Sequence, residues 1–165
     1  MTVQSTSVPV LSLTGDAEAA TSLHLDALAP GEHRMDTVVV RYRDDRDAVV
    51  ALRVECADPA PASRTVHVGV FEQAGDLMPF PVFSGSLLDL ARRDRPFGRW
   101  TGRGDGDDHE VVYEISTSVP RDAASASEPE DLTLHFTATP AAHAIPAGSA
   151  GLGPAVEGGG EPPRR

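Results

Sequence analysis

The chain has 165 residues, and its 25 acidic and 14 basic residues give a formal net charge of −11 at neutral pH. This length fits a single domain. An acidic chain lacks the basic footprint of nucleic-acid binding, so the composition argues against nucleic acid and anionic membranes as partners. The single cysteine, Cys56, excludes an internal disulfide and a cysteine-based zinc site.

Period-two alternation of apolar residues is the strongest pattern along the chain. A weak strand is predicted in VPVLSLT (8–14), and the alternating segments that follow are 35–43, 47–56, 64–72, 109–119 and 131–139. Successive side chains of a strand point to opposite faces, so this pattern indicates half-buried antiparallel strands. Cys56 ends one of these runs, where a small core residue is favoured over a reactive thiol.

Two further elements are expected in the middle of the chain. PFPVFSG (79–85) reads as a strand that its prolines confine to an edge, and GSLLDLARR (85–93) reads as the one helix. The pattern therefore predicts an all-β fold for residues 1–140, a two-sheet antiparallel sandwich of the jelly-roll or immunoglobulin type with one short helix. Residues 141–165, rich in Ala, Gly and Pro, are predicted to form a disordered tail.

The segment TGRGDGDDHE (101–110) concentrates glycines and acids. It lacks the EF-hand spacing, and His109-Glu110 lacks the second histidine of a zincin helix. A weak calcium site formed by Asp105, Asp107 and Asp108 stays open as the sharper interpretation. A solvated turn before the next strand is the simpler one, and it also accounts for the Arg-Gly-Asp triplet at 103–105.

No residue set in the sequence points to catalysis. No serine lies in a nucleophile elbow of the G-x-S-x-G type, and GGG (158–160) has no strand before it that would make a phosphate loop. We therefore expect a protein that is not an enzyme, without a cofactor or a small-molecule substrate. No segment has the apolar length of a membrane span, and residues 1–20 lack the features of a signal peptide.

Three segments together resemble the TasA/camelysin family of secreted bacterial matrix-fibre and cell-surface proteins. Residues 23–55 are similar to the family's strand, its L-x-P-G-[DE] turn (here 28–32) and the following strand pair. Residues 82–90 resemble its short strand and G-x-L-x-D-L element. Residues 108–140 resemble its closing strands, with Leu134, Phe136 and Ala138 in the F-x-F-x-A positions.

The resemblance implies a jelly-roll-like sandwich that is secreted or displayed on the cell surface. It also implies, for some members, fibres built by donating an N-terminal strand to the next subunit. The segment TSVPVLSLT (6–14) is the candidate donor, with Val8 and Val10 on one face and Leu11 and Leu13 on the other. The simpler alternative is that this segment is the first strand of its own sandwich.

The leading hypothesis is a non-enzymatic structural protein of the cell surface or matrix, whose partners are further copies of itself or a surface protein. The alternative is a β-sandwich binding or accessory module of a larger assembly, with loops 26–34 and 101–109 as its contact surface. A camelysin-like peptidase is a third interpretation, for which the sequence supplies no metal ligands.

Overall fold

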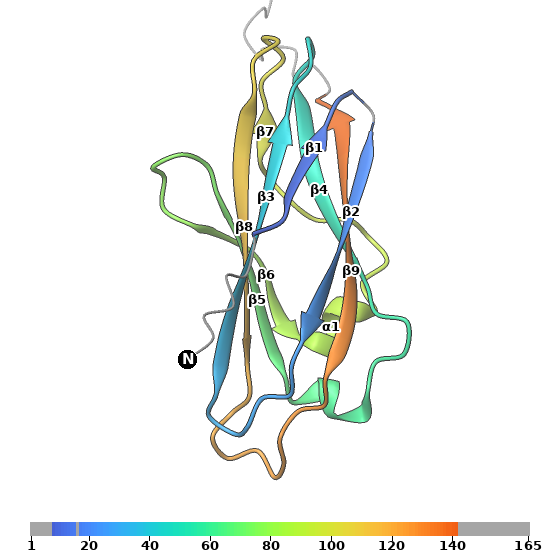
Figure 1. The fold of residues 1–165 in the computed structure, drawn as a ribbon, viewed down its shortest axis with the longest axis vertical. Helices are drawn as coiled ribbons and strands as arrows, with labels where there is room; N and C mark the ends of the chain where they lie inside the picture. The colour runs from blue at the N-terminus through green and yellow to red at the C-terminus, as the bar shows by residue number, and fades with distance from the viewer. Residues whose placement is uncertain (1–7, 16, 142–165) are drawn as a thin grey trace, which may run out of the picture.

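The chain folds into an elongated sandwich of two β-sheets, which Figure 1 shows with its long axis vertical. The structure is a computed structural model that describes residues 8–15 and 17–141. The predicted tail from residue 142 onward lies outside the described residues, while Ala141 donates its N–H to the carbonyl oxygen of Asp47 at 2.9 Å. The predicted two-sheet sandwich is confirmed.

The described residues contain nine strands in two sheets. Sheet A has the spatial order β1 (Val10–Leu13), β3 (His33–Tyr42), β8 (His109–Ser118), β5 (His67–Gln73) and β6 (Phe80–Ser86). Sheet B has the order β2 (Glu18–Leu25), β9 (Glu130–Pro140), β4 (Ala48–Glu55) and β7 (Thr101–Gly102).

The predicted helix is present with tighter bounds. Helix α1 (Leu87–Ala91) begins after Ser86, whose hydroxyl accepts the Asp89 N–H while the Asp89 carboxylate accepts the Ser86 N–H. This reciprocal capping box satisfies backbone donors at the helix start. A short 3₁₀ turn, η1 (Pro61–Arg64), precedes β5. No helix in the described part of the chain is long and apolar enough to cross a membrane.

The alternating residues of the sequence form the core between the sheets. The inward sets of β3, β4, β5, β8 and β9 are buried as predicted: Val38, Val40, Tyr42, Ala48, Val50, Leu52, Val54, Val66, Val68, Val70, Val111, Tyr113, Ile115, Val119, Leu132, Leu134, Phe136 and Ala138. The rings of Tyr113 and Phe136 meet across the sheets with centroids 5.0 Å apart. Cys56, expected in the core, is only partly buried at its edge.

Two strands depart from the expectation. β2 has no apolar alternation strong enough to stand out, because EAATSLHL carries small and polar residues, and it forms only by pairing along its whole length with β9. β1 pairs parallel to β3, whereas the other pairings between described strands are antiparallel. The turn after β1 leads into sheet B, so β1 and β3 are not joined as a hairpin.

The segment after α1 closes one lateral edge of the sandwich. Phe97 exchanges two backbone hydrogen bonds with Leu52, and the Val50 N–H bonds to the Trp100 carbonyl oxygen. Gly98 lies between them at φ 148°, where a Cβ atom would come 2.5 Å from the Val50 carbonyl oxygen. Only glycine fits this approach, which lets residues 97–102 extend sheet B beside β4.

Candidate interaction site

Residues 10–13 of the candidate donor segment form strand β1 at the edge of sheet A, while residues 6 and 7 lie outside the described residues. Leu13 is fully buried, Leu11 packs partly against the core, and Val8 and Val10 are 47% and 48% exposed. The predicted division into two faces is therefore confirmed for Val10, Leu11 and Leu13. In this structure the segment occupies its own sandwich, as the simpler alternative expects.

Few contacts hold β1 to the sheet. Its ladder covers four residue pairs, from Val10 opposite Val39 to Leu13 opposite Tyr42. Beyond the ladder, the Val39 N–H donates to the Pro9 carbonyl oxygen at 3.0 Å and the Arg43 N–H to the Leu13 carbonyl oxygen at 3.1 Å. Because a single side chain of the strand is fully buried, its apolar anchorage is worth only about 1.5–3 kcal/mol.

The edge of β3 is longer than the strand that covers it. β3 has ten residues, and among the described residues no strand pairs with the outer edge of its first six, residues 33–38. The edge of β3 thus offers more than twice the backbone that β1 uses.

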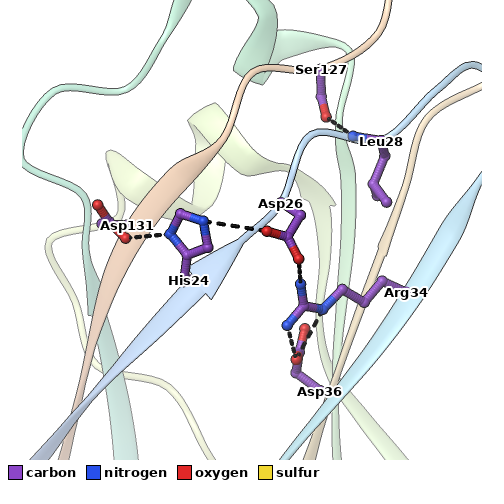
Figure 2. Close-up of polar contacts among 7 residues, drawn as sticks. All are labelled: His24, Asp26, Leu28, Arg34, Asp36, Ser127 and Asp131. Atoms are coloured by element: carbon purple, nitrogen blue, oxygen red, sulfur yellow. Dashed lines mark hydrogen bonds and ion pairs between the residues drawn. The ribbon is translucent and has the colours of Figure 1, made fainter. Parts of the chain in front are cut away.

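The loop 26–34, which joins β2 to β3, is fixed by a chain of charged contacts. Figure 2 shows it running from Asp131 through His24, Asp26 and Arg34 to Asp36. The His24 Nδ1 atom lies 2.6 Å from Asp131, and the Arg34 guanidinium lies 2.7 Å from Asp26 and 2.8 Å from Asp36. These side chains come from β2, β9 and β3, so the chain of contacts ties sheet A to sheet B.

Titration of this cluster follows from its geometry. The hydrogen bond that Asp131 accepts raises the pKa of His24 above its ordinary value, and the charges of Asp131 and Asp26 act in the same direction. The hydrogen bond to Asp36 likewise raises the pKa of Arg34. The protonated form of His24 is therefore favoured relative to that of an isolated imidazole.

Backbone bonds complete the anchoring of this loop. The Leu28 N–H donates to the Ser127 hydroxyl at 2.7 Å, as Figure 2 shows, and the Ser127 N–H donates to the Leu28 carbonyl oxygen at 2.8 Å. Gly31 donates to the Val119 carbonyl oxygen at 2.8 Å. The loop is consequently a braced connection at one end of the sandwich.

The acidic loop 101–109 is ordered by its own side chains. The Asp105 carboxylate contacts His109 Nε2 at 2.7 Å and accepts the Asp107 N–H at 3.0 Å. The His109 contact is the main cause that lowers the pKa of Asp105. The Gly104 N–H donates to Asp47 at 2.7 Å, and the Gly106 N–H to the Asp44 carbonyl oxygen at 2.9 Å.

This ordering bears on the calcium hypothesis. In the described part of the chain, no three His, Cys, Asp or Glu side chains are placed to hold a metal ion. One of the three candidate ligands, Asp105, already bonds to His109, while Asp107 and Asp108 are exposed. The calcium site at Asp105, Asp107 and Asp108 stays a prediction.

The two loops that the sequence joined into one contact surface lie at opposite ends of the sandwich (Figure 1). β3 runs from His33, beside loop 26–34, to Tyr42, beside loop 101–109. Ten strand residues separate the two loops by about 30 Å. The expectation of a joint surface at 26–34 and 101–109 is therefore wrong, because local sequence patterns do not encode which strand ends share an end of the sandwich.

Sequence reasoning missed two buried carboxylates. Glu72 accepts the Tyr113 hydroxyl at 2.9 Å and the Arg99 N–H at 2.9 Å, and burial strongly raises the pKa of Tyr113. Glu130 accepts the Ser63 hydroxyl at 2.7 Å and the Cys56 thiol at 3.4 Å.

Parity along the strands could have revealed both carboxylates. Glu72 has the same alternation as Val68 and Val70, and Glu130 has that of Leu132. A charged residue in an inward position implies polar partners inside the fold. Two of these partners, Ser63 and the Arg99 N–H, belong to the closing segments 57–66 and 97–100, which the sequence pattern did not place.

An apolar hairpin tip was also missed. The loop between β5 and β6 projects from the side of the sandwich (Figure 1). It exposes Leu77, Met78 and Phe80 by 71%, 87% and 45%. The Arg99 guanidinium lies 4.1 Å from the Phe80 ring centroid, which covers part of that ring. Side chains this exposed are available for contact with another protein.

Hydroxyl–imidazole geometry gives little support to catalysis. Ser84 Oγ lies 3.2 Å from His67 Nε2 on the outer face of sheet A. Both side chains are exposed, and among the described residues no carboxylate forms a hydrogen bond to His67. A nucleophile would need a base oriented by a third group.

Comparisons with known proteins assign no family. No protein-family model and no curated protein matches the chain. Two similar solved structures are periplasmic inhibitors of g-type lysozyme, a PliG-Ec mutant from Escherichia coli and PliG from Aeromonas hydrophila. They share 10% and 13% identity with this chain and cover 81% of it and 100% of their own length, each with a TM-score of 0.30.

A third similar structure is that of infectious bursal disease virus, Gx strain. It shares 8% identity, covers 78% of this chain and 33% of its own, and has a TM-score of 0.29. All three TM-scores are below 0.5, so these likenesses are no basis for assigning a function.

Proposed function

We propose that this protein is a non-enzymatic structural protein of the cell surface or extracellular matrix that assembles by exchanging strand β1 between copies. The observation that carries the proposal is the mismatch at the edge of sheet A. β1 covers four residues of a ten-residue strand and is held by one fully buried side chain, Leu13. The resemblance of residues 23–55, 82–90 and 108–140 to the TasA/camelysin family points in the same direction.

Exchange would preserve every contact that β1 makes within one chain. Backbone bonds to Val39 and Arg43 and the burial of Leu13 would form identically on a neighbouring copy. A donated strand that also pairs along residues 33–38 would add hydrogen bonds that the described β1 does not make. This is β-augmentation, in which main-chain pairing supplies affinity and alternate side chains fill pockets.

A disulfide lock tests the proposal in the full chain. Ser12 and Arg41 are exposed Cα partners in the β1–β3 ladder, so Ser12→Cys/Arg41→Cys in a Cys56→Ala background should link β1 to its own subunit. We expect the oxidised protein to form no open-ended assemblies at concentrations where the reduced protein forms them, measured by light scattering. Assembly that is equal in both redox states would contradict β1 exchange.

A second lock serves as the matched control. Thr37 and Glu114 are partners in the β3–β8 ladder, and Thr37→Cys/Glu114→Cys joins two strands that stay within one subunit in either arrangement. Its oxidation should leave assembly unchanged. A loss of assembly with this control would show that disulfides in sheet A act by general stiffening.

A binding module of a larger assembly is the second candidate function, and the apolar hairpin tip is the observation that favours it. Substitution of the exposed Leu77 and Met78 by serine would remove that apolar surface and leave β1 unchanged. Assembly that is lost with Leu77→Ser/Met78→Ser and kept with the oxidised β1 lock would favour the tip. We expect open-ended assembly to be kept with Leu77→Ser/Met78→Ser and lost with the oxidised β1 lock.

A further inference from the structure

Strand β2 forms an open edge of sheet B that is independent of β1. It pairs over eight residues with β9, and among the described residues no strand pairs with its other edge, although β1 lies close to part of β2. The Ala138 N–H bonds to the Ala17 carbonyl oxygen, which fixes the alternation of the ladder. Odd-numbered residues bond to β9, so Glu18, Ala20, Ser22 and His24 direct their backbone N–H and C=O groups to the open edge.

Side-chain burial agrees that this edge is uncovered. The inward-facing Ala19, Thr21 and Leu23 stay partly exposed, whereas their register partners Phe136 and Leu134 on β9 are 0% and 1% exposed. In proteins that avoid edge-to-edge pairing, the edge strands carry proline, lysine or a β-bulge. β2 has neither residue and no bulge in its register, while β6 on the opposite side has Pro81 and faces a register shift.

The sequence of β2 is complementary to itself in one antiparallel register. When two copies pair about Thr21, Ala20 lies opposite Ser22 and Glu18 lies opposite His24. All four are residues whose backbone groups point to the open edge, so about eight hydrogen bonds can form across the junction. Glu18 already contacts His135 at 2.8 Å and His24 already contacts Asp131 at 2.6 Å, so the junction would add a second opposite charge beside each of them. The two-fold axis repeats this carboxylate–imidazole pair in both halves of the junction.

We propose that two copies of this chain associate through β2, antiparallel and centred on Thr21, so that their four-stranded B sheets form one eight-stranded sheet. The occupant of the edge is a second copy because the register that matches its charges also matches its hydrogen-bonding groups. Neighbouring registers lose one of these matches. A shift by one residue pairs edge-directed groups with groups already bonded to β9, and a shift by two moves Glu18 away from His24.

This contact can be separated from β1 exchange, since the two use different sheets. Paired β2 edges give a closed dimer, whereas donation of β1 in one direction can extend without limit. The dimer should therefore persist when β1 is fixed by the oxidised Ser12→Cys/Arg41→Cys lock. Failure of the β2 contact leaves β1 exchange standing, and failure of β1 exchange leaves the β2 contact standing.

Proline at Ser22 is the variant that tests the edge. The Ser22 N–H points away from β9, so Ser22→Pro removes an edge donor and leaves the intramolecular ladder in place. By symmetry it removes two hydrogen bonds per dimer, which should weaken the dissociation constant about 10- to 100-fold in sedimentation velocity. Ser22→Ala is the control that changes the side chain alone, and circular dichroism with thermal melting checks the fold.

Cysteine cross-linking tests the register without relying on affinity. In a Cys56→Ala background, Thr21→Cys should form a symmetric intermolecular disulfide, because directly opposed Cα atoms lie about 4.5–5.5 Å apart. Ala20→Cys should cross-link far more slowly, since its symmetry mate lies two residues away along the partner strand. The proposal is overturned if the β1-locked chain is monomeric up to millimolar concentration, if Ser22→Pro dimerises like Ser22→Ala, or if both cysteines cross-link equally.

Discussion

On the side of β6 and β7 the sandwich is closed by its own chain, whereas on the side of β1 and β2 the described residues close it with little more than a four-residue strand. Residues 87–100 pass from sheet A to sheet B on the first side, where Phe97 bonds to Leu52 of β4 and Arg99 bonds to Glu72 of β5. On the second side, the charged contacts around His24 lie at one end of the sandwich, and β1 and β2 are the edge strands of the two sheets.

The strand edges on the two sides of the sandwich are therefore protected unequally. Exposed strand edges template pairing with other chains, so proteins cover them unless pairing serves a purpose. A register shift and a covering segment are both on the side of β6, which also carries Pro81, whereas the side of β1 has only Pro9 before the strand. The less protected side is where we place both proposed contacts between copies.

The largest expected effect concerns the closed side. Glu72→Ala leaves the buried Tyr113 hydroxyl and the Arg99 N–H without their acceptor, which should lower the free energy of unfolding by roughly 2–6 kcal/mol in urea titrations. Glu72→Gln keeps an acceptor oxygen and should lose much less. Equal stability of the wild type and Glu72→Ala would mean that this carboxylate does not seal the edge.

Truncation of Leu13 should loosen the open side locally. Leu13→Ala should cost about 2–3 kcal/mol, near the low end for buried leucines because β1 is a terminal strand. The amides of Val39 and Arg43, which bond to β1, should then lose about 30- to 150-fold of their hydrogen-exchange protection. The Leu52 amide on the closed side should keep its protection, and Val10→Ala should change none of the three.

If the Leu52 amide loses as much protection as Val39 and Arg43, then β1 opens only with the whole domain. The two sides would then form a single cooperative unit, and local release of β1 would not be the first step of exchange.

The next effect tests the second buried carboxylate. Burial, with a smaller contribution from Glu130, raises the pKa of the Cys56 thiol to about 11. At pH 8 the native thiol should react with alkylating reagents at least roughly 100-fold more slowly than in urea, since only the thiolate is nucleophilic. Glu130→Gln should speed the reaction. A native rate equal to the unfolded rate would show that residues 57–66 do not cover this thiol.

The smallest effect lies in the charged contacts of the open side. Because the bond to Asp131 raises the pKa of His24, the contribution of His24 to stability is present below pH of about 6.5 and is lost as the pH rises through the higher native pKa. Asp131→Asn should move the imidazole titration back toward the ordinary value, as followed by NMR. An unchanged titration would exclude this hydrogen bond as the cause.

The core of the fold was predictable because alternation is a property of each strand by itself. Leu52, Tyr113 and Phe136 stood out among polar neighbours, and all three are buried. β2 was missed because its small residues gain their place from β9, a partner more than a hundred residues away. The parallel direction of β1 depends on which sheet the next strand joins, which no local pattern encodes.

The candidate site was predictable in part. The two faces of residues 8–13 followed from alternation, but the uncovered length of β3 required the sheet order. The joint loop surface was wrong because proximity of strand ends is a property of topology. Glu72 and Glu130 stood in inward positions that the sequence displayed, and their partners appeared only once the closing segments were placed.

Trapping the exchanged strand covalently shows whether β1 moves between copies. The Ser12→Cys/Arg41→Cys chain, in the Cys56→Ala background, would be assembled under reducing conditions at high concentration, then oxidised and separated on a non-reducing gel. β1 exchange predicts a ladder of disulfide-linked dimers and larger species, with monomers alone when oxidation comes before concentration. Assembled protein that yields only monomeric bands would show that each β1 stays in its own subunit, and would contradict β1 exchange.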